Sequence, residues 1–339
     1  MLYYIPQTRM LSSAQNSLSP DSKTKTIFGE LLSFLIVASI VSFAISFIQS
    51  MAMSFLMFFD PQYYEITQEA VQIGTMDMQM LLDYMNSFLA NLPGEIYVVF
   101  LASSGLYIPG SIIYCKCFEK RRLFSIGFNK KGVIPEYLFG IAVGTLMISI
   151  PAFICYLTGC VRFSFGASVS PLVIALFFLA FVLQGLGEEV LFRGYLLTSL
   201  SRRHNVWVAI IVSSLMFAVF HISNANFGII PFINITLFGV FSSVFMLKRG
   251  SIWAVGAIHT VWNFLQGNVF GISVSGNPRF PSVLEANDAD FGSILSGGDF
   301  GLEGGLGVTV ILLVCLLLAL LMPAKKSELE AVGSTFDEK

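Results

Sequence analysis

The chain has 339 residues, of which 55% are hydrophobic and only 12% are charged, and its mean hydropathy is +0.77. Soluble domains carry roughly 25% charged residues, so this composition indicates a polytopic membrane protein. The formal net charge of −2, with no basic stripe interleaved with aromatic residues, excludes a nucleic-acid-binding surface. We expect an all-α polytopic helical bundle in a cell membrane, with the lipid bilayer as its surroundings.

Residues 1–28 are polar and rich in Ser and Thr, and they predict a cytoplasmic N-terminal tail. The apolar run that follows is too long for the core of a signal peptide and predicts a retained signal anchor. We expect a single transmembrane domain over residues 29–323 and a second polar cytoplasmic tail over 324–339. A helix that crosses about 30 Å of hydrocarbon needs roughly 20 apolar residues. About eight segments qualify, some slightly short: 30–59, 96–115, 133–158, 171–200, 206–222, 228–247, 251–270 and 307–322.

The basic residues indicate the direction of these segments. If the N-terminus is cytoplasmic, the cytoplasmic segments hold 16 of the 19 Lys and Arg residues, and only Arg162, Arg193 and Arg279 fall elsewhere. Cytoplasmic loops of membrane proteins carry an excess of Lys and Arg, so both termini are predicted to be cytoplasmic. The last outer loop, about 271–306, is rich in glycine, and two interpretations of it remain open: a mobile lid and a plain surface loop.

Three charged residues interrupt the fourth apolar segment: Glu188, Glu189 and Arg193. A charge in the bilayer interior costs several kcal/mol, about 2.5–3.5 on insertion scales, so the three residues indicate a buried site. Residues four apart share a helix face, and Glu189 and Arg193 can therefore form an ion pair that leaves Glu188 free. An inert buried network of all three is the alternative.

Only three histidines occur in the chain. His204 lies in a basic loop and is expected to be solvated. His221 falls near the end of the fifth segment, and His259 lies in the seventh, on the same helix face as Asn263. Because ionisable groups in membranes gather inside the bundle, we expect Glu188, His221, His259 and Asn263 to line one water-filled cavity that opens toward the cytoplasm.

Two kinds of chemistry fit these groups. A carboxylate beside an imidazole can take a proton from water, while a second imidazole and an amide can stabilise an oxyanion, which together would hydrolyse a carbonyl compound. Alternatively, Glu188, His221 and His259 could hold a divalent metal such as zinc with one open position. Spacing alone does not decide between them. No GxSxG motif is present, and the five cysteines, Cys115, Cys117, Cys155, Cys160 and Cys315, are expected to be small hydrophobic residues.

The strings EEVLFR (188–193), FAVFH (217–221) and HTVWN (259–263) resemble the EExxxR, FxxxH and HxxxN motifs of the CPBP family of intramembrane proteases, also called Abi or CAAX prenyl endopeptidase-like. The resemblance covers about residues 171–270 and is closest to bacterial members. It implies an endopeptidase in which Glu188 and His221 activate water, His259 and Asn263 stabilise the oxyanion, and Glu189 with Arg193 maintains the site.

The resemblance implies a membrane-associated peptide or protein as substrate, of unknown identity, and leaves metal dependence open. Two other functions remain as alternatives: a transporter that uses the buried Glu and His residues, and a non-enzymatic immunity or scaffold protein. Asn224, Asn226 and Asn234 resemble polar positions that follow the second motif in bacterial members, although turn formation explains asparagines equally well.

Overall fold

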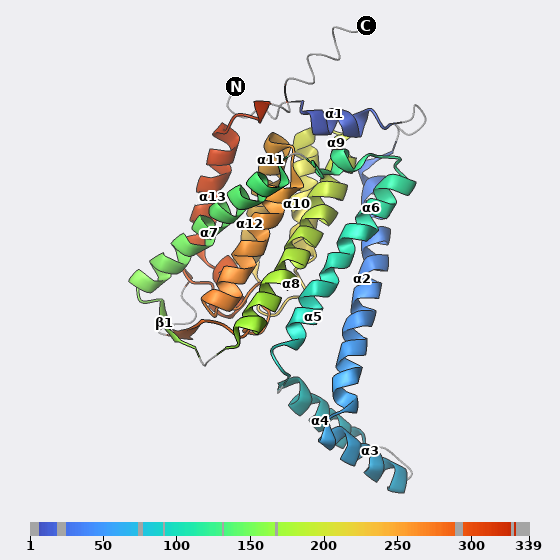
Figure 1. Cartoon of the computed structure of the whole chain (residues 1–339), viewed down its shortest axis with the longest axis vertical. Coiled ribbons are helices and arrows are strands. Elements are labelled where there is room, and N and C mark those ends of the chain that lie inside the picture. The colour runs from blue at the N-terminus through green and yellow to red at the C-terminus, as the bar shows by residue number, and fades with distance from the viewer. Residues whose placement is uncertain are drawn as a thin grey trace.

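The computed structural model describes residues 7–18, 25–73, 77–90, 92–130, 132–166, 169–288, 294–326 and 329. Over these residues the chain is a bundle of helices, as predicted (Figure 1). The α-helices are α1 Arg9–Gln15, α2 Ile27–Phe58, α3 Pro61–Ile73, α4 Met78–Ala90, α5 Ile96–Ser103, α6 Tyr107–Cys117, α7 Val133–Leu157, α8 Pro171–Glu189, α9 Thr198–Ser201, α10 Val206–Val219, α11 Ile229–Arg249, α12 Ile252–Phe264 and α13 Leu306–Leu321.

Within the described residues, five helical stretches are long and apolar enough to cross a membrane: Ile27–Phe58, Ile96–Cys117, Val133–Leu157, Pro171–Ser201 and Ile229–Arg249. Two shorter apolar helices, α10 and α13, pack with them, and α12 lies against α7 and α8 in the centre of the bundle. Large apolar side chains such as Phe43 (75% exposed) and Ile40 (66%) cover the outside of α2. Such a surface suits hydrocarbon rather than water, and the chain is a multi-pass membrane protein.

Glycines allow the three central helices to approach closely. A Cβ atom at Gly140 of α7 would lie 2.2 Å from the carbonyl oxygen of Ala254 in α12. One at Gly185 of α8 would lie 2.8 Å from the backbone nitrogen of Thr260, also in α12. Small residues at helix interfaces bring backbones together in membranes. Here they bring the helix with the paired glutamates against the helix with His259.

Two π-helical segments follow directly after the helices that carry these residues. Segment η4, Val190–Leu197, joins α8 to α9, and segment η5, Leu265–Val269, continues α12. The π-helix is rare and occurs mostly as short bulges within α-helices, often at functional sites. Neither segment was predicted from the spacing of the polar residues.

One end of the bundle carries both ends of the described chain. Helix α1 packs its buried residues Met10 and Leu11 against the core, and Gln15 Nε2 donates a hydrogen bond to the carbonyl of Ser201 at 3.4 Å. The backbone N–H of Lys325 donates to the carbonyl of Lys248 at 2.9 Å. The segment expected to be a polar tail therefore contains a docked amphipathic helix. We call this end of the bundle the terminal end.

The opposite end holds α3, α4 and a small sheet (Figure 1). Strand β1, Val161–Phe165, pairs antiparallel with β2, Leu284–Asp288, which is the one sheet in the described part of the chain. The outer loop is not a plain surface loop. Its Phe280 is buried and packs on Phe177 and Phe181 of α8, with ring centroids 5.3 and 5.9 Å apart.

Candidate active site

Glu189 contacts two of the predicted site residues, Arg193 and His259. Its Oε2 lies 3.2 Å from Arg193 Nε, and both side chains are buried, with 0% and 1% exposed. The predicted ion pair is therefore present. The Arg193 guanidinium also lies over the Phe217 ring, 4.2 Å from its centroid. A cation is attracted to the face of an aromatic ring, so Phe217 adds to the stabilisation that Glu189 gives the guanidinium.

The second carboxylate oxygen of Glu189 orients His259. Glu189 Oε1 lies 3.0 Å from His259 Nδ1. An ionised carboxylate only accepts hydrogen bonds, so His259 Nδ1 carries a proton and donates a hydrogen bond to Glu189. The other ring nitrogen, Nε2, faces Glu188 Oε2 at 3.8 Å. The sequence placed Glu189 with Arg193 alone, whereas the structure adds this contact with His259.

Gln184 is the polar residue that the sequence analysis missed. Its Nε2 donates to Glu188 Oε1 at 2.6 Å, and its Oε1 accepts from Asn263 Nδ2 at 3.0 Å. The side chain thus bridges the free carboxylate to the amide of the third motif. Gln184 precedes Glu188 by four residues in an apolar run, and this spacing is a signal that could have identified it.

His221 enters the site from a turn. Helix α10 ends at Val219, and not at residue 222 as predicted, so His221 lies in the turn after the helix. Its Nδ1 lies 2.8 Å from the carbonyl oxygen of Phe217. Because a carbonyl only accepts, Nδ1 is the protonated nitrogen and Nε2 is left as an acceptor. From this turn the His221 side chain lines the cavity described next.

A cavity of about 370 Å³ brings the four predicted residues together. Glu188, His221, His259 and Asn263 all line it. The remaining walls are mostly aromatic and amide side chains: Gln49, Tyr97, Phe100, Leu101, Ser104, Tyr107, Phe181, Gln184, Phe192, Phe220, Asn224, Val274, Ser275, Asn277 and Phe280.

The walls of the cavity extend away from the terminal end. Tyr97 and Phe100 belong to the first turns of α5, and Asn277 and Phe280 to the outer loop, and all lie toward the end of the bundle that holds α3 and α4. The expected opening toward the cytoplasm stays a prediction, and the contribution of the outer loop to the walls could not be predicted from the sequence.

Polar contacts fix the outer loop beside the site. Gln266 Nε2, on η5, donates to the carbonyl of Ser273 at 2.6 Å and to a carboxylate oxygen of the buried Glu303. Asn224 Nδ2 donates to the carbonyl of Ser275 at 2.8 Å, and Asn234 Nδ2 to that of Glu303 at 2.7 Å. Asn226 has a positive φ of 58°. In this structure, Asn224 and Asn234 hold the loop, and Asn226 shapes a turn.

The residues named for a metal do not form a three-ligand site. Among the described residues, no group of three His, Cys, Asp or Glu side chains is placed to hold a metal ion. Nδ1 is engaged in both histidines, by Glu189 in His259 and by a backbone carbonyl in His221, so Nε2 is the nitrogen left for other contacts. In this geometry Glu188, His221 and His259 are not placed as a set of three metal ligands.

The fold and the site define a multi-pass membrane protein with a cluster of carboxylate, imidazole and amide groups inside its helical bundle. Residues 170–265 match the family model described as Rce1-like, type II CAAX prenyl endopeptidase. The matched segment resembles this family of CPBP proteases and contains all six motif residues. No curated protein matches the chain. A bacterial type stays a prediction.

Proposed function

We propose that the protein is an intramembrane endopeptidase that hydrolyses a peptide bond of a membrane-associated peptide or protein with an activated water molecule. The family match supports a CAAX endopeptidase-like activity. The observation that carries the proposal is the meeting of Glu188, His221, His259 and Asn263 on one cavity, from three separate stretches of sequence.

In this proposal Glu188 and His221 act on the water. Glu188 Oε2 accepts no hydrogen bond from the described residues. The hydrogen bond of His221 to the Phe217 carbonyl uses Nδ1, so Nε2 can accept a hydrogen bond from water. His221 Nε2 orients the water by accepting a hydrogen bond from it, and Glu188 removes a proton from it, as a general base within hydrogen-bond reach can. The water oxygen forms a bond to the scissile carbonyl carbon, and the carbonyl oxygen becomes an oxyanion.

His259 and Asn263 stabilise that oxyanion. Asn263 Nδ2 uses one N–H for Gln184 and has a second one left. Because His259 Nδ1 donates to Glu189, its Nε2 can donate only when the ring carries both protons. When the intermediate collapses, the C–N bond breaks and Glu188 returns its proton to the leaving nitrogen. Donors aimed at the developing charge are each worth roughly 10²–10³ in rate.

The test is cleavage of a peptide library by purified protein in detergent, read by mass spectrometry. Glu188→Gln keeps the acceptor for Gln184 but cannot take a proton, so it should lower the rate roughly 10²–10⁴-fold with an unchanged melting temperature. A matched control is Leu179→Ala, which changes a lipid-facing residue of the same helix, 58% exposed. Full activity in Glu188→Gln would remove this carboxylate from the mechanism.

A further inference from the structure

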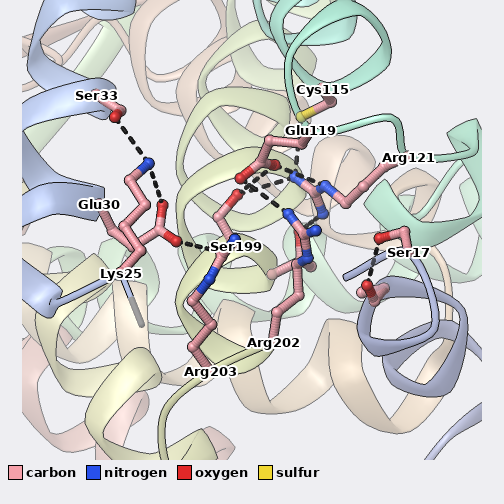
Figure 2. A network of polar contacts seen from close by, with 12 residues as sticks. Ser17, Lys25, Glu30, Ser33, Cys115, Glu119, Arg121, Ser199, Arg202 and Arg203 are labelled. Atoms are coloured by element: carbon pink, nitrogen blue, oxygen red, sulfur yellow. Dashed lines mark hydrogen bonds and ion pairs between the residues drawn. The ribbon is translucent and has the colours of Figure 1, made fainter. Parts of the chain in front are cut away.

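The terminal end of the bundle is closed between α2, α6 and α9 by two buried ionic clusters (Figure 2). In the first, Glu119 pairs with Arg121 Nε at 2.8 Å and with Arg202 Nη1 at 3.0 Å, and it accepts from Ser199 Oγ at 2.8 Å. In the second, Arg203 pairs with Glu30 of α2. Loss of one partner of such a pair leaves an uncompensated buried charge, so these pairs are costly to separate.

A layer of aromatic rings lies between these clusters and the cavity. The Phe34 ring, which is 0% exposed, packs on Phe192 and Phe220, with centroids 5.4 and 5.6 Å apart. Phe192 and Phe220 are themselves wall residues of the cavity. A substrate that approached from the terminal end would have to part both this aromatic layer and the ionic clusters behind it.

The cavity instead continues toward the opposite end. Gln49 lies about 33 Å along α2 from Ile27 at 1.5 Å per residue, and it lines the cavity. Tyr97 lines it from the second residue of α5, and Asn277 from the outer loop. The wall thus reaches the end of the bundle where α3 and α4 lie (Figure 1). The distribution of Lys and Arg predicts that this end is extracytoplasmic.

This end also carries an excess of negative charge. Residues 60–95, which connect α2 to α5, contain six acidic residues and no Lys or Arg. Their two helices, α3 and α4, are joined to the two helices that contribute Gln49 and Tyr97 to the cavity. Glu65, Glu69 and Asp83 are exposed. A cationic partner is attracted to such a surface, and like charges are repelled from it.

We propose that the cavity receives a basic, extracytoplasmic segment of an exported peptide or membrane protein. The inference rests on the proposed function and adds the side of the membrane and the charge of the substrate. The acidic helices α3 and α4 attract the basic residues, and the scissile bond then reaches Glu188 by way of Tyr97 and Gln49.

The side of entry is tested in vesicles. The full chain is placed in right-side-out and inside-out membrane vesicles, and a quenched fluorescent peptide library with Lys and Arg flanking residues is added outside. Orientation is checked with an impermeant maleimide, which reacts with the exposed Cys117 at the terminal end and with an introduced Gln68→Cys in α3. We expect at least tenfold faster cleavage in right-side-out vesicles.

Faster cleavage in inside-out vesicles would overturn the inference while leaving the proposed function intact. An absence of cleavage in detergent, where both ends are accessible, would overturn the proposed function and the inference with it. Impermeant labelling of Cys117 in right-side-out vesicles would contradict the predicted orientation and so the extracytoplasmic entry.

The charge is tested with the triple variant Glu65→Gln, Glu69→Gln, Asp83→Asn. We expect KM for the basic library to rise roughly threefold to tenfold at low ionic strength and the difference to shrink in 1 M salt, where the Debye length is about 3 Å. The matched control removes two exposed carboxylates away from α3 and α4, Glu285→Gln with Asp299→Asn, and should leave KM unchanged. Equal cleavage of the basic library and a Glu-flanked one would contradict the basic substrate.

Discussion

Gln184 donates a 2.6 Å hydrogen bond to Glu188, and this contact determines which carboxylate oxygen is available for chemistry. With Oε1 engaged by Gln184, Oε2 is the oxygen that faces His259. The same glutamine accepts from Asn263, so one side chain positions a group from each of two motifs.

Replacing Gln184 by Leu should therefore impair catalysis more than binding. The variant leaves Glu188 Oε1 without its donor and Asn263 without its acceptor, so both groups can rotate away from the reacting atoms. We expect kcat to fall roughly 10-fold to 100-fold, as small misplacements of catalytic groups do, with KM nearly unchanged. A variant whose KM rises while kcat is retained would show that Gln184 contacts the substrate instead.

Arg193→Met should lower both stability and activity. It leaves the Glu189 carboxylate buried with His259 alone, and loss of one partner of a buried pair costs about 3–5 kcal/mol. The double variant Arg193→Met, Glu189→Gln should recover part of the melting temperature, because the amide oxygen can still accept from His259 Nδ1 and no charge is buried. Melting temperatures from tryptophan fluorescence complete the cycle, and a double variant less stable than Arg193→Met would contradict the pairing.

The cluster around Glu119 predicts a dependence of stability on pH. Burial raises the pKa of Glu119, but Arg121, Arg202 and the hydroxyl of Ser199 more than offset this, so the pKa lies below its usual 4.5. A lowered pKa means that the unfolded chain binds protons more readily, and the stabilisation is complete above pH 4.5 and is lost as the pH falls below it. The difference in melting temperature between the protein and Glu119→Gln should be largest at neutral pH and shrink on acidification. A difference that grows with acid would refute this.

Chelators should leave cleavage unchanged. The proposed reaction activates water with Glu188 and His221, which line one cavity, and none of its steps uses a metal. The purified protein is treated with EDTA and 1,10-phenanthroline, and its metal content is measured before and after. Loss of activity that added zinc restores would require a different arrangement of these side chains.

The sequence was sufficient for the fold class and for the pairing of Glu189 with Arg193, because hydropathy and i, i+4 spacing are local properties. Glu189 and Arg193 share a helix face whatever surrounds them. The direction of the cavity depended on the packing of Phe280 against α8, which involves segments about a hundred residues apart. The end of α10 at Val219 was missed because Phe220 and Ile222 are apolar and extend the pattern past His221, while the helix does not continue.

The π-helical segment η4 lies between two parts of one continuous helical stretch, α8 to α9. The part before it carries Glu188 and Glu189, and the part after it carries Ser199, which contacts Glu119. A π turn contains one residue more than the α turn it replaces, and each residue of an α-helix turns it by about 100°. Deletion of a single residue between Val190 and Leu197 would turn Ser199 and Arg202 away from Glu119 while Glu188 and Glu189 kept their places. The extra residue therefore sets the rotation of Ser199 and Arg202 about the helix axis relative to Glu188 and Glu189. The contacts at the terminal end and the orientation of the glutamates can thus change independently.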